Sequence, residues 1–378
     1  MDWTIWLEWV IKAIILIMGL LTGFAYLTWY ERRALARIQV RIGPNRAGWQ
    51  GLLQPIADAV KLIFKEELTP AKADKLIFFI APLLTMVPSI VIAAVIPFGP
   101  TTELFGRQIS FSMANINVGV LFLMAIASIA VYGIVLAGWS SNNKYAMLGG
   151  LRSSAQMISY ELSLGLGFVT AILLGNSMNL HDIVEAQSGM WFAVIQPVGA
   201  LIFMIVTLAE VNRAPFDMPE AEQELTAGYH SEYSGMKFAL FFMAEYQKMI
   251  VICMIAATLF FGGYREFWFL KGTFFSVDQH WWLGPIYILL KVVVLLFFMI
   301  WIRATWPRIR YDRLMAFGWK VLLPLSLAVV FISAVGVLMA QDLNPLFIWA
   351  VPVVSLLVGL VAVILIDRTL RRKNNARL

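Results

Sequence analysis

Four carboxylates lie inside or at the ends of long apolar stretches, where ionisable side chains are uncommon. They are Glu31, Glu161, Glu210 and Glu245. An ionised side chain at the centre of a bilayer costs about 2.5–3.5 kcal/mol on insertion scales, so such residues persist where they face water or a partner. Burial also raises the proton affinity of a carboxylate. The pattern therefore favours a proton relay, above all at Glu161 and Glu245.

Local explanations remain open for each of these acids. Glu245 and Lys248 are three residues apart, a spacing at which two side chains of one helix can pair. Glu31 and Glu210 fall at the ends of their stretches, where a charged side chain can reach the interface or pair nearby. Lys291 lies deeper in its stretch and needs either a partner or the loss of its charge.

A second unusual feature is the acidic segment 210–237. It contains only two cations, Arg213 and Lys237, against Glu210, Asp217, Glu220, Glu222, Glu224 and Glu232. Pro215 and Pro219 prevent one long helix through it. Interleaved aromatic residues such as Phe216 predict a packed segment and not a solvated loop. The arginine-rich segment 31–75 is its complement, so together they predict a cavity with walls of both signs or a docking face.

Hydropathy supplies the elements that must position these residues. The chain has 378 residues, of which 60% are hydrophobic and 14% charged, whereas a soluble domain has roughly 25% charged residues. A membrane-spanning helix needs about 20 apolar residues. The sequence therefore predicts an all-α polytopic protein, a single membrane domain over 1–378, with about nine spans. These are 10–30, 76–97, 116–138, 155–175, 190–209, 238–262, 283–302, 320–340 and 346–366.

The residues between these stretches predict an orientation. Lysines and arginines gather in 31–75, in the loop after 283–302 and in the tail 367–378. The positive-inside rule then places the N-terminus outside and the C-terminus in the cytoplasm. We expect the net charge of +6 to reflect this orientation and not a nucleic-acid partner. The first stretch lacks a small-residue cleavage site after it and is interpreted as a retained helix.

One shorter segment, 52–66, has apolar residues at helical spacing, with Asp58 and Lys61 on the other face. This pattern predicts an amphipathic helix along the cytoplasmic interface, which could be a simple surface anchor. Counted from Ser153, Glu161 would lie roughly 12 Å into the membrane, with Glu245 at a similar depth.

The sequence gives no sign of a resident metal or redox centre. Cys253 is the only cysteine, and the three histidines, His181, His230 and His280, lie far apart. An iron–sulfur cluster needs about four ligands. Neither a dinucleotide fingerprint nor a Walker loop is present. If electrons matter here, we expect other subunits to carry them.

Several long blocks resemble one family, that of the H subunit of the bacterial proton-pumping NADH–quinone oxidoreductase, respiratory complex I. They are ERRALARIQVRIGPNRAGWQGLLQPIADAVKLIFKEE, YELSLGL, EVNRAPFDMPEAEQELTAGYHSEYSGMKFALFFMAEY and WIRATWPRIRYDRLM. The resemblance runs to about residue 320. It implies a protein of the bacterial inner membrane that binds quinone at an interface with other subunits. The implied partners are the soluble quinone-site and iron–sulfur subunits and the antiporter-like membrane subunits.

The resemblance also implies roles for individual residues. Those expected at the quinone chamber or docking surface are Glu31, Arg32, Arg41, Arg46, Asp58, Phe216 and Arg303. Those expected in the proton path are Glu161, Glu210 and Glu245, with Asp217, Glu220, Glu222, Glu224 and Glu232 as a coupling loop. No catalytic redox residue is expected in this chain.

Three other functions remain open from the residues. A homologous membrane subunit of a membrane-bound hydrogenase or related dehydrogenase need not bind quinone. A free-standing ion transporter would act alone, and a structural anchor would tolerate neutralisation of the acidic segment. The sequence leaves open the choice between ubiquinone and menaquinone, the electron donor, the proton stoichiometry and which glutamates are protonated at rest.

Overall fold

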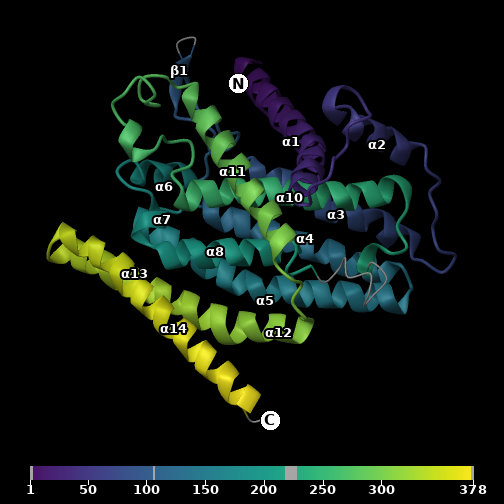
Figure 1. Ribbon diagram of the computed structural model, residues 1–378. Coiled ribbons are helices and arrows are strands. Elements are labelled where there is room, and N and C mark those ends of the chain that lie inside the picture. The colour runs from purple at the N-terminus through teal and green to yellow at the C-terminus, as the bar shows by residue number, and fades with distance from the viewer. Residues whose placement is uncertain (1–2, 105–106, 218–227, 376–378) are drawn as a thin grey trace.

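The computed structural model describes residues 3–104, 107–217 and 228–375, and these form a bundle of long helices (Figure 1). Within those ranges, eight helices are long and apolar enough to cross a membrane. They are α1 (Trp3–Ile38), α3 (Lys75–Ala93), α4 (Gly119–Ser140), α5 (Lys144–Gly175), α10 (Gly235–Phe260), α11 (Leu283–Thr305), Tyr311–Asp342 and Pro345–Leu365. The prediction of an all-α polytopic protein is confirmed.

The last two of these helices are composite. The first joins α12 (Tyr311–Phe317), a π-helical turn (Gly318–Leu322) and α13 (Leu323–Asp342). In the second, a 3-10 turn (Pro345–Trp349) leads into α14 (Ala350–Asn375). The remaining predicted span, 190–209, is divided between α7 (Phe192–Ile195) and α8 (Pro197–Glu210). Gln196 has φ −132° and ψ 71°, and proline follows it, so the helix is interrupted there.

Two of the predicted helix boundaries were wrong in ways that matter for the carboxylates. We expected Glu31 to end the first helix, but α1 continues to Ile38 and Glu31 lies within it. We counted the depth of Glu161 from Ser153, but α5 begins at Lys144, where Asn143 caps it by accepting from the Tyr145 amide. About 25 Å of helix therefore precedes Glu161, at 1.5 Å per residue.

The predicted amphipathic segment is helical as α2 (Gln54–Ile63), with Pro55 in its first turn. Its apolar residues Ile56, Val60 and Ile63 are exposed, and no residue of α2 is buried. The helix lies at the edge of the bundle, at the right of Figure 1, after the 3-10 turn Trp49–Gly51, and it contacts α1 and α10. Such a face suits a membrane surface, which stays a prediction.

Short elements connect the spans at the end of the bundle where α3, α5 and α10 end. They are the antiparallel hairpin β1 (Thr102–Leu104) and β2 (Arg107–Ile109), α6 (Leu180–Ala186) and a 3-10 turn (Trp268–Leu270). A further 3-10 turn, η2 (Gly228–His230), precedes α10.

The centre of the bundle is α10. In the most apolar 18-residue stretch of α10, 56% of the residues are buried. The corresponding share is 11% for α1 and for the helix containing α14. Close helix packing depends on small residues, as is usual in membranes. A side chain at Gly133 of α4 would collide with Thr85 of α3, and one at Gly149 of α5 would collide with the backbone of Gly228. This packing holds α4 against α3 and α5 against η2.

Candidate functional site

Glu161, Glu210 and Glu245 come from α5, α8 and α10 and line two cavities that adjoin each other. The first cavity, of about 50 Å³, contains Glu210 and Glu245 in its wall. The second, of about 40 Å³, contains Glu161 and Glu210. Glu210 belongs to both walls, so the three predicted relay acids are brought together in the order Glu245, Glu210, Glu161.

The size and lining of the cavities suit water. A cavity needs roughly 10–15 Å³ of such space for one water molecule and two to four polar partners for it. The first cavity offers His230, Asn212 and Thr85 besides its two glutamates. The second is mostly apolar, with Leu123, Phe168 and Val251 in its wall. Small-molecule sites are usually about 300–1,000 Å³, so neither cavity fits a quinone head group.

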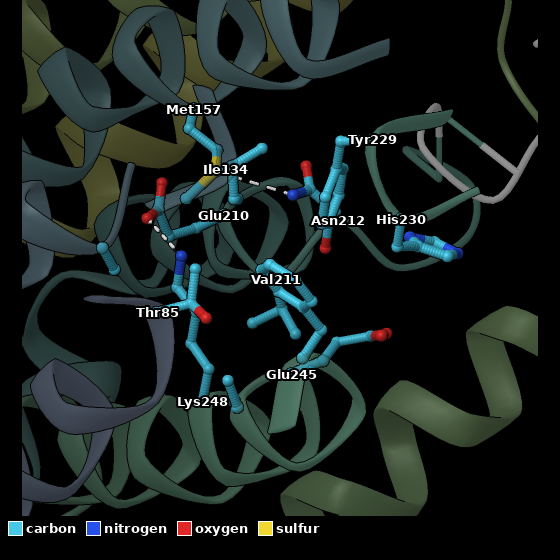
Figure 2. Close-up of a pocket in the computed structure, with 13 residues that line it drawn as sticks. Thr85, Ile134, Met157, Glu210, Val211, Asn212, Tyr229, His230, Glu245 and Lys248 are labelled. Atoms are coloured by element: carbon cyan, nitrogen blue, oxygen red, sulfur yellow. Dashed lines mark hydrogen bonds and ion pairs between the residues drawn. The ribbon is translucent and has the colours of Figure 1, made fainter. Parts of the chain in front are cut away.

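Glu210 is the last residue of α8 and is buried. Its Oε1 accepts a hydrogen bond of 2.8 Å from the Lys248 ammonium of α10. Its Oε2 is buried with no hydrogen-bond partner among the described residues. In Figure 2 the two side chains point toward each other, while the Glu245 carboxylate points away from Lys248. The pairing considered above, of Lys248 with Glu245, is replaced by a pair between helices.

Glu161 has a neighbour from α4 instead of a cation. Ser128 donates a short hydrogen bond to its Oε1. Ser128 also contacts the Met124 carbonyl at 3.0 Å, one turn before it on the same helix. The hydroxyl therefore fixes the direction in which the Glu161 carboxyl points.

Glu31 and Glu245 share one cation, Arg213. The Arg213 side chain is 3% exposed and lies 3.1 Å from Glu31 Oε1 and 2.7 Å from Glu245 Oε1. Its guanidinium also stacks 4.4 Å from the Tyr246 ring centre. Burial alone would lower the pKa of Arg213, but the charges of Glu245 and Glu31 raise it well above its usual value. Arg213 is therefore a permanent cation.

A second cation reaches Glu31 from α11. Arg303 forms a short ion pair with Glu31 Oε1, and its own side chain is 29% exposed. The two arginines and two glutamates tie α1, α10 and α11 to the residues after α8. Glu31 and Arg303, both expected at the quinone side, are thus in contact, and this group adjoins the first cavity through Glu245.

The arginine-rich segment forms a separate and more exposed group. Arg32 of α1 is 2.7 Å from Asp58 of α2, which also accepts a hydrogen bond of 3.1 Å from Gln54. Arg41 is exposed and donates to Gln39 at 2.8 Å, and Arg46 is exposed. The structure therefore joins Arg32 to Asp58 but does not bring Arg41 or Arg46 to them.

Parts of the acidic segment are packed, as the interleaved aromatics predicted. Asp217 is 1% exposed and 3.2 Å from Arg308. Phe216 is buried against Tyr160, and its carbonyl accepts from Gln156 at 2.9 Å. Glu232 accepts from Asn143 at 2.7 Å. The predicted site residues Glu220, Glu222 and Glu224 lie outside the described residues.

The sequence suggested Lys248 only as a partner of Glu245, and it suggested no role for Arg213, Ser128, Asn212 or His230. Arg213 could have been suspected, because it is a cation beside the acids singled out. Ser128 and Asn212 gave no signal, since single polar residues of these types are common in membrane helices.

Lys291, whose partner the sequence left open, lies at the opposite end of the bundle. Its ammonium donates to the carbonyls of Gly263 at 2.8 Å and Arg265 at 2.6 Å. The ammonium also lies over the Trp191 ring, 4.7 Å from the ring centre. Nearby, Arg265 pairs with Glu185 and with Asp278. Lys291 therefore holds the loop after α10 by hydrogen bonds to its backbone.

Comparison with known proteins supports one family. The family model described as NADH dehydrogenase matches residues 11–334. The chain is 50% identical over 338 residues to an NADH-quinone oxidoreductase H subunit of Geobacter metallireducens, covering 86% of this chain and 94% of that protein. It is 50% identical to the H subunit of Thermomicrobium roseum (86% and 95% covered) and 48% identical to that of Protochlamydia amoebophila (83% and 92%). The chain therefore belongs to the family of the NADH-quinone oxidoreductase H subunits, which are membrane subunits of complex I.

Proposed function

We propose that this subunit couples the reduction of quinone to the movement of protons, and that its proton path begins at Glu245, Glu210 and Glu161. The observation that carries the proposal is the pair of water-sized cavities with these three carboxylates in their walls. Water bridging buried carboxylates is a route for protons, and ionisable residues at such depth usually mark one. The relatives' shared name supplies the reaction.

Quinone itself would bind at a surface shared with other subunits, because the two cavities are too small for its head group. On this proposal Glu31, Arg303 and Phe216 stand on the inner side of that surface, and Arg32, Asp58, Arg41 and Arg46 on the outer side. Their partners would be the soluble iron–sulfur subunits. The antiporter-like subunits would receive the protons, and these glutamates would start the path toward them.

The orientation belongs to the same proposal. The arginine group joins the end of α1 and the end of α11 to the start of α10, so these three ends lie together. The basic segments 31–75 and 303–313 leave the bundle at that end. The positive-inside rule makes it the cytoplasmic side of the bacterial inner membrane, with the N-terminus outside.

The chemistry follows from charge. A neutral quinone that accepts two electrons becomes an anion that demands protons. Glu31 and Glu245 share Arg213, so a new anion near Arg303 and Glu31 would weaken the hold of Arg213 on Glu245. Glu245 is then available to exchange a proton with water in the first cavity. Asp217, held by Arg308, and the acidic residues Glu220, Glu222, Glu224 and Glu232 would respond to the same change.

The proposal is tested in the assembled complex with Glu161→Gln and Glu245→Gln. Each amide keeps the shape of the side chain but cannot take up and release a proton. Quinone reduction coupled to proton transfer should fall at least roughly tenfold, because proton transfer by a positioned side chain typically contributes about 10²–10⁴-fold to a rate. Reduction of an artificial acceptor that bypasses quinone should stay normal, as a control for assembly. Coupled turnover at the wild-type rate in both variants would contradict the proposal.

A further inference from the structure

Lys248 is in contact with both cavities, and the proposed path so far gives it no role. Of the residues that the structure describes, only Glu210 and Lys248 line both the first and the second cavity. Their side chains are joined at 2.8 Å. The pair therefore forms the boundary between the two water-sized spaces, with Glu245 on one side and Glu161 on the other.

The surroundings of the pair are unequal. The Glu210 side chain is 5% exposed and that of Lys248 is 19% exposed. Glu210 Oε1 is bound to Lys248, whereas Oε2 is buried with no hydrogen-bond partner in the described part of the chain. The carboxylate thus has one occupied and one available oxygen. A proton can arrive on the available oxygen without first displacing the lysine.

A buried ion pair of this kind adds little to stability, because the cost of removing both charges from water offsets their attraction. A lysine is also a poor clamp, since its ammonium is a point charge on a flexible four-carbon stem. These properties suit a contact that forms and breaks better than one that only holds helices together.

We propose that Lys248 is a positioning residue that holds Glu210 as a carboxylate between the two cavities and releases it when Glu210 takes up a proton. The proposal rests on the proposed proton path and deepens it. A proton passes from water in the Glu245 cavity to Glu210, which becomes a neutral acid. The attraction to Lys248 then falls, and its ammonium, which keeps all three protons, turns away.

The second half of the cycle restores the pair. Once the ammonium has moved, the neutral acid faces water in the Glu161 cavity and gives its proton to it. Glu210 is again a carboxylate and attracts Lys248 back. Ser128 holds the Glu161 carboxyl in a fixed direction, ready to receive the proton from that water. The lysine thereby keeps the two cavities from exchanging protons except through Glu210.

The test uses the assembled complex with Lys248→Met, which keeps the length of the side chain and removes its charge. Coupled turnover should fall roughly tenfold or more. Lys248→Arg should keep most of it, because the charge pair can still form. Lys248→Gln, which can still donate a hydrogen bond to Glu210, provides the same loss of charge with less disturbance of packing if the methionine variant fails to assemble.

Infrared spectroscopy tests whether Lys248 keeps Glu210 ionised. A carboxylate this buried takes up a proton when its cation is removed. Lys248→Met should therefore gain the absorption of one neutral carboxylic acid, and the double variant Lys248→Met with Glu210→Gln should lose it again. A Lys248→Met variant without this absorption would show that the lysine does not hold Glu210 as a carboxylate.

The outcomes separate this proposal from the proton path on which it rests. If Glu210→Gln loses coupled turnover while Lys248→Met keeps the wild-type rate or shows no new acid absorption, the role of Lys248 is overturned and the path stands. If Glu210→Gln also keeps the wild-type rate, the path through Glu210 is overturned together with it. If Glu210→Gln and Lys248→Met both lose turnover, and Lys248→Met gains the acid absorption, the proton path and the role of Lys248 are both supported.

Discussion

Lys248 on α10 and Lys291 on α11 are both withdrawn from solvent on neighbouring helices, yet their ammonium groups have different partners. Lys291 donates to two backbone carbonyls and faces an indole ring. Lys248 binds a carboxylate that can gain and lose a proton, and it lines two cavities. Lys248 lies near the middle of α10, about 18 Å of helix before its end at Phe260, whereas Lys291 binds the loop that follows that end.

The comparison extends to the acids around each lysine. Near Lys291, Glu185 binds both Tyr264 and Arg265, and Glu266 accepts from Ser276 at 3.0 Å and from the Val277 amide at 3.2 Å. Near Lys248, one oxygen of Glu210 is buried without a hydrogen-bond partner among the described residues. The carboxylates near Lys291 are bound through both oxygens, although Arg265 Nε and Trp191 Nε1 beside them are buried without a partner among the described residues. A carboxylate with spare hydrogen-bonding capacity beside a cavity can exchange protons. On the proposed proton path the two regions therefore have different functions, although both contain buried charge.

The largest effect should come from Arg213→Met, which removes the cation shared by Glu31 and Glu245. Breaking a buried ion pair by removing one partner costs about 3–5 kcal/mol. We expect little assembled complex, measured as the amount recovered in mild detergent.

Arg213→Lys is the matched control for this change. A lysine keeps the charge but lacks the fork that reaches two carboxylates, so the loss should be smaller. Equal recovery of Arg213→Met and wild type would show that the cation is not needed to hold these helices together.

An intermediate effect on stability, without one on turnover, should come from Lys291→Met. The carbonyls of Gly263 and Arg265 would lose the ammonium that binds them, at a cost of about 1–3 kcal/mol for buried groups. The midpoint of thermal inactivation should fall, while the turnover of complex that has assembled stays unchanged. Leu290→Met, on an exposed position beside it, controls for the new side chain. If Lys291→Met lost turnover at unchanged thermal stability, Lys291 would have a role in proton movement. The proposed difference between Lys291 and Lys248 would then not hold.

The smallest effect should come from Arg32→Ala or Asp58→Ala. Their ion pair is partly exposed, and such pairs are worth about 0.2–1 kcal/mol. We expect normal assembly and an apparent KM for quinone raised by up to about fivefold, the binding equivalent of 1 kcal/mol.

Exchanging the two charges, Arg32→Asp with Asp58→Arg, should recover part of that loss. An unchanged KM in both single variants, with quinones of several tail lengths, would count against a role of this surface in quinone entry.

The sequence predicted most of the fold because length and hydropathy alone select spanning helices. The sequence predicted helix boundaries less well where the packing of helices against one another determines them. Residues 144–154 have an apolar run too short to indicate a spanning helix, yet they form the start of α5, where Gly149 and Gly150 allow η2 and α4 to approach closely. The interruption before Pro197 was likewise invisible to a count of apolar residues.

The acids of the candidate site could be predicted, and their partners could not. An ionisable residue in an apolar helix is conspicuous in any sequence, which made Glu161 and Glu245 candidates. Spacing along one helix suggested Glu245 as the partner of Lys248, but the partner is Glu210, 38 residues earlier on another helix. Only the packing of α8 against α10 makes that pair.

The central claim is that the carboxylates beside the cavities carry protons while those at the other end hold the structure. The most direct test measures protons transferred per NADH oxidised in vesicles for Glu161→Gln and for Glu185→Gln. Glu185 is a matched control, because it too is a hydrogen-bonded carboxylate of this membrane protein. The account predicts loss of transfer in Glu161→Gln and wild-type transfer in assembled Glu185→Gln. Equal transfer in the two variants, or the reverse order, would contradict it.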